Sequence, residues 1–293
     1  FLSPNSLTIP MLSFLRRNVI LAIMDIVPYK MRKTAELKIR ILFMQMPLAL
    51  KITRHFLAIS NSTKKDLVKY MNIDPSKITV TPLAAHDWCF EETTGDEIDR
   101  VRKNYGINND YFLFVSTLEP RKNIPNLIKA YKRFLNESRK KVDLVIGGKK
   151  GWMYEDIFKL VKENNLVDNV IFTDYIPDED LLPLYKGALA FTFVSWMEGF
   201  GLTPLEAMAV GIPVICSNTS SLPEVVGDSA ILVDPSNIKE IANAMIKLTT
   251  DNELRTELVM KGKKQVSKFS WEKTASLTLD VIKEFKSGKN KSN

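Results

Sequence analysis

Between Tyr111 and Val233 the pattern of apolar residues alternates between two periods. Short runs of consecutive apolar residues are separated by segments in which apolar residues recur every three or four positions, as at Leu127, Tyr131 and Phe134. Continuous apolar runs are typical of strands that are buried on both faces of a sheet. The pattern therefore predicts a parallel sheet covered by helices on both faces. The expected strands are 112–115, 142–146, 170–173, 189–194, 214–216 and 230–233. The expected helices lie around 127–134 and at 154–161, 178–186, 204–210, 238–248, 253–269 and 271–285.

The first 95 residues show a weaker version of the same pattern. Strands are expected at 18–26, 56–59 and 78–80, a helix at 64–70, and one long basic helix at Met31–Thr53. The polar stretch Asp87–Asp110 is expected to link two domains. The fold class is thus α/β with two parallel sheets, the first of them incomplete.

Composition narrows the class of protein further. Of the 293 residues, 45% are hydrophobic and 26% are charged, which is typical of a soluble globular protein. No apolar run reaches the length of ~18 residues that a membrane span needs. The two cysteines are too few for a disulfide framework, so we expect a reducing compartment. Their spacing from His55 and His86 fits no familiar zinc site.

The formal net charge of +7 suits an anionic partner such as a nucleotide, a phospholipid surface or a nucleic acid. Nucleic acid is the least expected of these, because the lysines are scattered and not interleaved with aromatic residues. The basic and partly apolar segment Met31–Arg54 fits either a solvated domain face or a contact with a membrane surface.

The run Glu198–Glu206, with sequence EGFGLTPLE, lies between an expected strand and an expected helix. Its two glycines allow backbone amides to approach a ligand, and Thr203 with Pro204 fits the first positions of a helix. Free amides and the helix dipole at such a place favour an anion. The same residues also fit a capping box, in which Glu206 only returns to the Thr203 amide. Spacing alone leaves both readings open, and Glu198 is either a ligand-facing carboxylate or a solvated loop acid.

A second cluster, Ser116–Asn123 with sequence STLEPRKN, also follows a strand and opens a helix, with Asn123 as the expected N-cap. Arg121 and Lys122 are cations at the carboxyl end of the sheet, where they could neutralise a diphosphate. A basic surface turn is the alternative.

These two clusters carry a resemblance to a known family. The chain resembles the retaining glycosyltransferases of family 4, also called glycosyl transferases group 1, which have the two-domain GT-B architecture. The Glu-x7-Glu loop is preceded by Tyr175-Ile176-Pro177 and followed by Ala207-Met208-Ala209-x-Gly211-x-Pro213. The resemblance implies a partial N-terminal, acceptor-side Rossmann-like domain at 1–95 and a nucleotide-sugar-binding Rossmann-like domain at 106–270. It also implies a C-terminal helix at 271–286 that packs back on the first domain.

The resemblance also implies a reaction and roles for single residues. The reaction is transfer of a hexose, with mannose as a first guess, from a GDP- or UDP-sugar to a glycan or lipid-linked acceptor, with retained configuration and without a metal or other cofactor. Glu198 is expected to contact the transferred sugar, and Glu206 to accept hydrogen bonds from the ribose. The remaining donor-binding residues are expected to hold the diphosphate or border the base, and they are Arg121, Lys122, Tyr175, Ile176, Gly199, Phe200, Gly201, Leu202 and Thr203.

The chain departs from the family pattern at three places. Met24-Asp25 stands where many relatives have His-Asp, Ser116-Thr117 stands where many have Gly-Arg, and the usual N-terminal glycine-rich loop is absent. These departures predict either a truncated chain, completed by a missing segment or a partner chain, or a degenerate first domain. A donor-binding domain inactive alone and a sugar-nucleotide epimerase of GT-B fold therefore remain as alternatives. The expected location is the cytoplasm, peripheral to the inner face of an anionic membrane.

Two further motifs are expected to be structural. Asp178-Glu179-Asp180 is an Asp-x-Asp motif, but it follows Pro177 and is expected to cap a helix rather than to hold a metal. The segment Gly147–Gly151 lacks the spacing of a phosphate-binding P-loop and is expected to be a turn after a strand.

Overall fold

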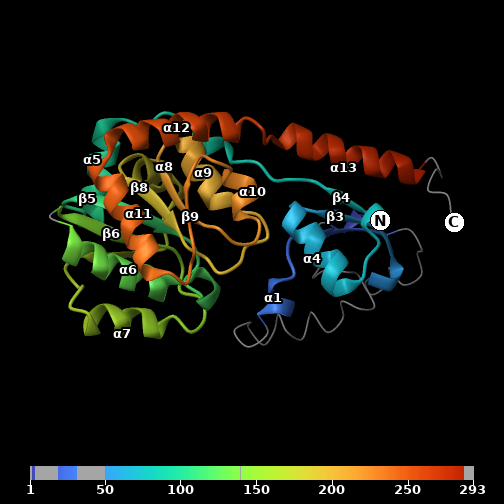
Figure 1. The fold of residues 1–293 in the computed structure, drawn as a ribbon. Coiled ribbons are helices and arrows are strands. Elements are labelled where there is room, and N and C mark those ends of the chain that lie inside the picture. Colours follow the sequence, from blue (N-terminus) through green and yellow to red (C-terminus); the bar gives the residue numbers. More distant parts are fainter. Residues whose placement is uncertain (1, 4–18, 32–49, 139, 287–293) are drawn as a thin grey trace. The chain divides into compact units, whose positions relative to one another are not determined.

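The computed structural model describes residues 2–3, 19–31, 50–138 and 140–286. The chain divides into two compact units (Figure 1). Unit 1 comprises Phe1–Ala84, Glu198–Phe200 and Phe269–Asn293, and unit 2 comprises Ala85–Met197 and Gly201–Lys268. Among the described residues, no helix combines the length and the apolarity that crossing a bilayer requires.

Unit 2 contains a six-stranded parallel sheet in the order β10-β9-β8-β5-β6-β7. The strands are β5 (Asp110–Val115), β6 (Val142–Gly147), β7 (Val170–Asp174), β8 (Ala190–Phe193), β9 (Val214–Ser217) and β10 (Ile231–Val233). The helices are α5 (Gly95–Asn104), α6 (Ile124–Glu137), α7 (Glu155–Glu163), α8 (Asp178–Lys186), α9 (Leu202–Val210), α10 (Leu222–Val226), α11 (Ile238–Thr250) and α12 (Asn252–Val266). Every strand expected in this region is present, within a few residues at each end.

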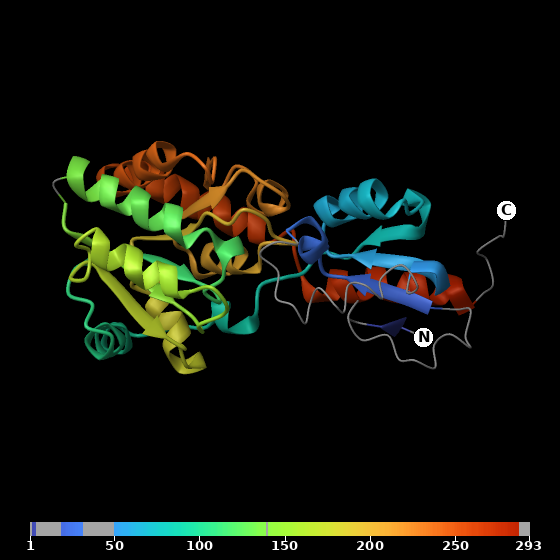
Figure 2. The same cartoon turned by 90° about the horizontal axis from the view of Figure 1, so that it is seen from below.

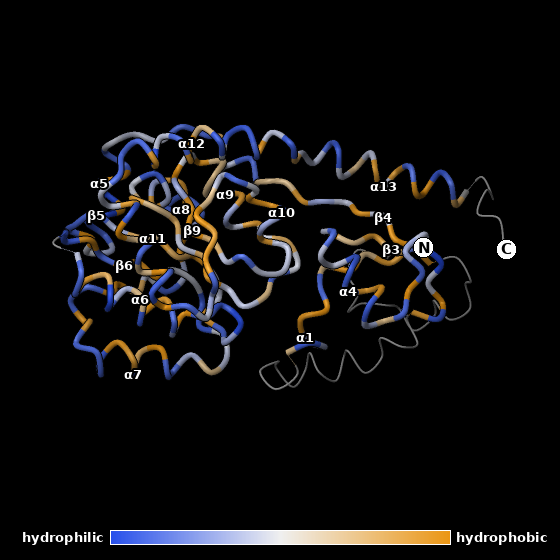
Figure 3. The backbone as a smooth tube through the Cα atoms, in the orientation of Figure 1, coloured by the Kyte–Doolittle hydropathy of each residue, from blue (hydrophilic) through white to orange (hydrophobic). Residues whose placement is uncertain are grey.

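The helices of unit 2 form two groups that are joined by the contact between α11 and α12. Helix α6 packs against α11 and α7, whereas α8 packs against α5 and α9, and α9 packs against α12 (Figures 1 and 2). The central strands are strongly apolar, and most of β9 is hydrophobic in Figure 3. Tyr111–Phe114 of β5 are completely buried, which is the burial that continuous apolar runs predict.

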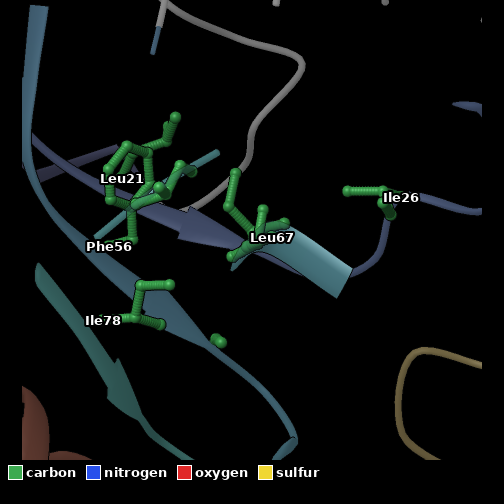
Figure 4. Close-up of a cluster of buried hydrophobic side chains, with 8 residues drawn as sticks. Leu21, Ile26, Phe56, Leu67 and Ile78 are labelled. Atoms are coloured by element: carbon green, nitrogen blue, oxygen red, sulfur yellow. The ribbon is translucent and has the colours of Figure 1, made fainter. Parts of the chain in front are cut away.

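Unit 1 contains a four-stranded parallel sheet in the order β1-β2-β3-β4. Its elements are β1 (Leu2–Ser3), β2 (Val19–Ile23), β3 (Thr53–Ala58), β4 (Ile78–Val80), α1 (Val27–Lys30), α4 (Asn61–Met71) and α13 (Trp271–Lys286). One face of the sheet packs against α4 through Leu21, Phe56, Leu67 and Ile78 (Figure 4).

The opposite face of this sheet is covered by the C-terminal helix α13. Ile20 of β2 and Leu57 of β3 form a buried cluster with Val281, and Ile282 and Phe285 pack around it. Because side chains alternate between the two faces of a strand, neighbouring residues of β2 face α4 and α13 in turn. Helix α13, the last element among the described residues, therefore completes the core of the unit that contains β2 and β3.

Two expectations from sequence need comment. The long basic helix at Met31–Thr53 lies almost entirely outside the described residues. The stretch Asp87–Asp110, expected as a linker, instead folds into the 3-10 helix η3 (Asp87–Phe90) and α5 within unit 2. A capping box formed by Thr94 and Glu97 begins helix α5. Val101 is the buried residue of this helix, so most of its side chains are in contact with solvent. The polar sequence of this stretch therefore belongs to a surface helix and not to a linker.

The packing of α13 predicts the effect of truncating Val281. Val281 is 5% exposed, whereas Leu279 on the same helix is 48% exposed. Val281→Ala should cost ~1.5–3 kcal/mol of local stability, because it removes buried methyl groups and leaves a cavity. Leu279→Ala should cost under ~0.5 kcal/mol. The protection of the β2 and β3 amides from hydrogen exchange measures the local stability of the sheet in each variant. Equal protection in the two variants would contradict the packing of α13 on this sheet.

Candidate functional site

The loops at the carboxyl edge of the unit 2 sheet are joined by the buried side chain of Asn123. Its Nδ2 donates to the carbonyl oxygens of Val194, after β8, and Pro235, after β10, at 2.9 and 2.8 Å. Asn123 occupies the N-cap position of α6, as expected, but its side chain makes no capping hydrogen bond. Its backbone is left-handed with φ 58°, a conformation that asparagine tolerates better than most residues. The residue therefore holds three loops together instead of capping a helix.

Arg121 fixes the loop after β8 to the loop after β5. Its guanidinium forms an ion pair with Glu119, at 2.6 Å from Nη2 to Oε1, and Nη1 donates to the carbonyl of Met197 at 3.1 Å. The Trp196 amide donates in turn to the Arg121 carbonyl. Glu119 is 6% exposed, so this carboxylate offsets part of the positive charge that Arg121 brings to the edge of the sheet.

The glycine-rich turn after β6 forms backbone hydrogen bonds with the loop after β5. Gly151 donates its amide to the Leu118 carbonyl, and Leu118 donates to the Lys149 carbonyl. Gly148 has φ 134°, and a Cβ there would lie 2.0 Å from the Ser116 carbonyl oxygen. The close approach of the two backbones explains these glycines. The expectation of a turn after the strand agrees with this geometry.

Helix α9 begins two residues earlier than its sequence suggests. Its first residue is Leu202 and its N-cap is Gly201, with φ 127°, so Thr203 and Pro204 are the second and third helical residues. The prediction of Thr203 as N-cap is wrong, because glycine can take the positive φ with which the chain enters this helix. The capping box between Thr203 and Glu206 is excluded as well, since no side chain caps α9. The first-turn amides of Leu202 and Thr203 have no acceptor within the helix and are available to an anion.

The carboxylate of Glu206, freed from any capping role, contacts an imidazole. Its Oε1 lies 2.6 Å from Nδ1 of His86, the residue before η3. The Glu206 side chain is 8% exposed and that of His86 is 51% exposed. Both line a cavity of about 380 Å³, together with Trp88, Val115, Asp178, Leu181, Tyr185 and Thr203. Burial raises the pKa of Glu206 above its ordinary value, and the contact with His86 opposes that rise.

Two aromatic residues, Trp88 and Tyr185, are among those that line this cavity. The ring of Tyr185 packs edge-on against Trp88 at 5.5 Å and stacks on Phe191 at 5.3 Å. Burial, and secondarily the charge of Glu206, raises the pKa values of both Cys89 and Tyr185. These two groups therefore stay neutral at physiological pH, and the carboxyl groups that line the cavity are those of Glu206 and Asp178.

Four other donor-binding residues expected from sequence follow β5 or β7 and so lie at the same edge of the sheet, but they do not line this cavity: Arg121, Lys122, Tyr175 and Ile176. Lys122 is 7% exposed, and its Nζ lies 5.0 Å from the ring centroid of Phe193. Tyr175 is 56% exposed, with Lys149 Nζ 4.6 Å from its ring, whereas Ile176 is buried against Gly147. Of the expected residues only Thr203 and Glu206 line the cavity.

The segment Glu198–Phe200 belongs to unit 1. The Gly199 carbonyl accepts from the hydroxyls of Ser60 and Thr63 at the start of α4, at 2.6 and 3.2 Å. A Cβ on Gly199 would lie 2.3 Å from the Met24 carbonyl oxygen, which explains the glycine. Phe200 is buried, with its ring edge-on to Phe269 at 5.7 Å. Of the two glutamates of the loop, Glu198 thus lies in unit 1 and Glu206 in unit 2.

The Asp-x-Asp motif has a structural role different from the one predicted. The N-cap of α8 is Pro177, and Asp178 is already helical, so the prediction of a side-chain cap is wrong. Asp180 is 6% exposed, forms an ion pair with Arg100 at 2.9 Å and accepts a hydrogen bond from the Tyr105 hydroxyl at 3.0 Å. The motif therefore attaches α5 to α8. Within the described ranges, no three His, Cys, Asp or Glu side chains are grouped so that they could hold a metal ion.

Sequence reasoning missed His86 and Trp88. Trp88 lies in the stretch expected as a linker and His86 directly before it, and His86 is 120 positions from its partner in the chain. The signal that could have indicated them is an aromatic residue and an imidazole, His86-Asp87-Trp88, in an otherwise polar segment.

Comparison with known proteins identifies the family. The family model of glycosyl transferases group 1 matches residues 97–265, more than half of the chain, and the chain belongs to this family. It is 32% identical over 248 residues to O-antigen chain mannosyltransferase B of Escherichia coli, covering 84% of this chain and 65% of that protein. It is also 32% identical over 226 residues to the serotype-specific mannosyltransferase WbdA of Escherichia coli, covering 76% of this chain and 28% of WbdA. The chain therefore spans less than two thirds of the length of either relative.

Solved structures support the fold. A glycosyltransferase from Rickettsia africae superposes with a TM-score of 0.75 at 17% identity, covering 91% of this chain and 70% of that one. The Anabaena protein HepE, solved in complex with UDP-glucose, superposes with a TM-score of 0.76 at 20% identity, covering 94% and 74%. The expected α/β fold of GT-B type, with parallel sheets, is confirmed.

The role of Asn123 predicts a large effect of its removal. Asn123→Ala should destabilise unit 2 by ~2–5 kcal/mol, because it places alanine at a left-handed position and removes the Asn123 hydrogen bonds to the buried carbonyls of Val194 and Pro235, of which Pro235 keeps a second donor in Asn126. Asn165 has nearly the same backbone conformation, φ 56°, on the exposed surface and provides a control. Asn165→Ala should cost only ~1 kcal/mol from the backbone alone. Urea unfolding measures both, and equal losses would exclude a specific contribution from the two hydrogen bonds.

The burial of Glu206 predicts how pH affects stability. A carboxyl pKa raised by folding means that the native state binds the proton more tightly than the unfolded state does. Stability is then highest below the ordinary carboxyl pKa of 4.5 and is lost as pH rises through the raised value. Glu206→Gln removes this loss, so the Tm of the variant relative to wild type should increase between about pH 4 and pH 8. Thermal unfolding across this range tests the sign, and a relative Tm that falls with pH would contradict it.

Proposed function

We propose that the chain is a hexosyltransferase that moves a sugar, mannose in the first instance, from a GDP- or UDP-sugar to a glycan or lipid-linked acceptor with retention of configuration. The observation that carries this proposal is Glu206, a buried carboxylate that caps no helix and lines a cavity of about 380 Å³. A buried charge that the fold does not need for capping is typical of a ligand-binding group. The related E. coli proteins are named mannosyltransferases, which supports mannose as the sugar to test first.

The chemistry requires two kinds of electrostatic support. Cleavage of a sugar–phosphate bond places negative charge on the leaving diphosphate and positive character on the sugar. Lys122, with Arg121 beside it, and the amides of Gly201, Leu202 and Thr203 are proposed to stabilise the diphosphate, while Gly199 and Phe200 shape the start of the loop. Glu206 is proposed to bind the ribose, Tyr175 and Ile176 to border the base, and Glu198 to face the sugar.

Because protein cations and helix amides supply the positive potential, we propose that no metal ion is required. The proposed location is the cytoplasm, at the inner face of an anionic membrane, where a lipid-linked acceptor would be found. Both proposals concern the whole protein, since the chain spans less than two thirds of the length of the two E. coli relatives.

Donor binding and turnover test this function in one design. GDP or UDP should bind in the presence of a chelator, and Glu206→Gln should weaken that binding by ~1–3 kcal/mol, the scale of a lost hydrogen bond to a charged group. Glu198→Gln should leave the affinity for the free nucleotide nearly unchanged, because that ligand lacks the sugar. The same variant should lower sugar transfer at least ~100-fold.

The measurements are calorimetry with each nucleotide and transfer of radiolabelled mannose to a lipid-linked or glycan acceptor. Binding that appears only after Mg²⁺ or Mn²⁺ is added would refute metal independence. Unchanged nucleotide affinity in Glu206→Gln together with unchanged turnover in Glu198→Gln would refute the assignment of the site. Isomerisation of the donor without transfer would favour an epimerase.

A further inference from the structure

His86 is the one hydrogen-bond partner of the Glu206 side chain among the described residues, and no element of the proposed function uses it. The imidazole approaches from η3 and reaches one carboxylate oxygen, Oε1, at 2.6 Å. With the carboxylate ionised, Nδ1 must be the donor, since a carboxylate only accepts. One oxygen of Glu206 is thus held by the protein, which limits rotation of the carboxylate group within the cavity.

We propose that His86 is a positioning residue for the nucleotide ribose: it holds Oε1 of Glu206 so that Oε2 is presented to the vicinal hydroxyls of the nucleoside. This inference rests on the proposed function, because it needs Glu206 to bind ribose. It adds a residue that lies before the part of the chain matched by the family model. The chemical class of ligand that it favours is one with a free cis-diol attached to a diphosphate.

The burial of the two side chains supports a positioning role over a solvated ion pair. Glu206 is 8% exposed and is fixed on α9, so the low-dielectric surroundings strengthen its hydrogen bond. The His86 side chain is 51% exposed, so the desolvation cost of this contact is lower than that of an ion pair in which both partners are buried. The packing of Trp88 against Tyr185 anchors η3, and this contact fixes the backbone that carries His86.

The test compares two substitutions of His86 with two ligands. His86→Leu removes the donor at similar size, whereas His86→Asn keeps a side-chain N–H near the position of Nδ1. GDP and UDP carry the ribose, and inorganic pyrophosphate carries only the diphosphate. We expect His86→Leu to weaken nucleoside diphosphate binding about 10-fold, within the range for a hydrogen bond to a charged group, and to leave pyrophosphate binding unchanged. His86→Asn should restore the nucleotide affinity to within about threefold of wild type.

A double-mutant cycle shows whether His86 acts through Glu206. In a Glu206→Gln background, His86→Leu should have no further effect on nucleotide affinity, because the group that it positions is gone. An undiminished effect in that background would overturn the proposal. So would an equal loss of pyrophosphate binding, which indicates a general change in the site. Matching circular dichroism and unfolding transitions establish that the variants are folded.

The pH dependence of nucleotide affinity separates two effects of His86 on the Glu206 carboxylate, its hydrogen bond and its charge. The titratable groups around the Glu206 carboxylate are His86, Asp87 and Cys89 on or beside η3, and Asp178 and Tyr185 on α8. Burial raises the pKa of Glu206, and His86 opposes this. As pH is lowered, nucleotide affinity of His86→Leu should therefore begin to fall at a higher pH than that of wild type. His86→Asn should show a smaller shift, because its amide keeps a hydrogen bond to the carboxylate and lacks only the charge of the imidazole. Superimposable profiles for the three proteins would overturn the role.

Failure of the inference and failure of the proposed function give different results. A wild-type protein that binds neither GDP nor UDP, with or without added metal, refutes the proposed function and the role of His86 with it. A wild-type protein that binds them, together with a His86→Leu variant of equal affinity, refutes only the role of His86.

Discussion

The candidate site depends on how the loops at the carboxyl edge of the unit 2 sheet satisfy their backbone polar groups. Beyond the last residue of each strand, carbonyl and amide groups lose their ladder partners, and a buried group without a partner costs ~1–3 kcal/mol. Asn123 supplies donors to two of these loops, and the Ser217 hydroxyl donates to the Ser195 carbonyl at 2.7 Å. All three side chains, Asn123, Ser195 and Ser217, are buried. The edge is therefore preorganised before any ligand arrives, which lowers the cost of ordering it on binding.

Against this ordered background, Glu206 is a local exception. Burial disfavours its charge, and the fold gains neither a helix cap nor a fully buried ion pair from it. Binding sites usually contain residues that lower the stability of the fold and form no stabilising contact in exchange, because the requirements of stability and function oppose each other there. Asp180 provides the contrast: equally buried, it joins α5 to α8 through two partners and is explained by the fold alone.

Local pattern was sufficient to predict the strands of unit 2, because continuous apolar runs such as Phe112–Val115 leave few alternatives to a buried parallel strand. It failed at the start of α9, where Thr203-Pro204 is a better local signal than Gly201, yet the loop geometry required a positive φ. It also failed for Asn123, whose side chain was expected to cap its own helix but binds carbonyls 71 and 112 positions away. Local propensity predicts where an element lies. It does not predict which distant group a polar side chain will reach, and the His86–Glu206 contact is of that kind.

The aromatic core of unit 2 connects these electrostatic features. Tyr185 stacks on Phe191, Phe191 on Phe193, and Phe193 on Phe114, at centroid distances of 5.3 to 5.9 Å. Glu206 lies beside one end of this row, and the Lys122 ammonium lies over Phe193 near the other. An aromatic ring attracts a cation, yet it offers no hydrogen bonds to compete with a ligand anion. Rings also exclude water and so lower the effective dielectric around both charges, which strengthens their interaction with any ligand that reaches them. The packing that stabilises the sheet is thus also the condition under which a few charged side chains at its edge could bind a nucleotide.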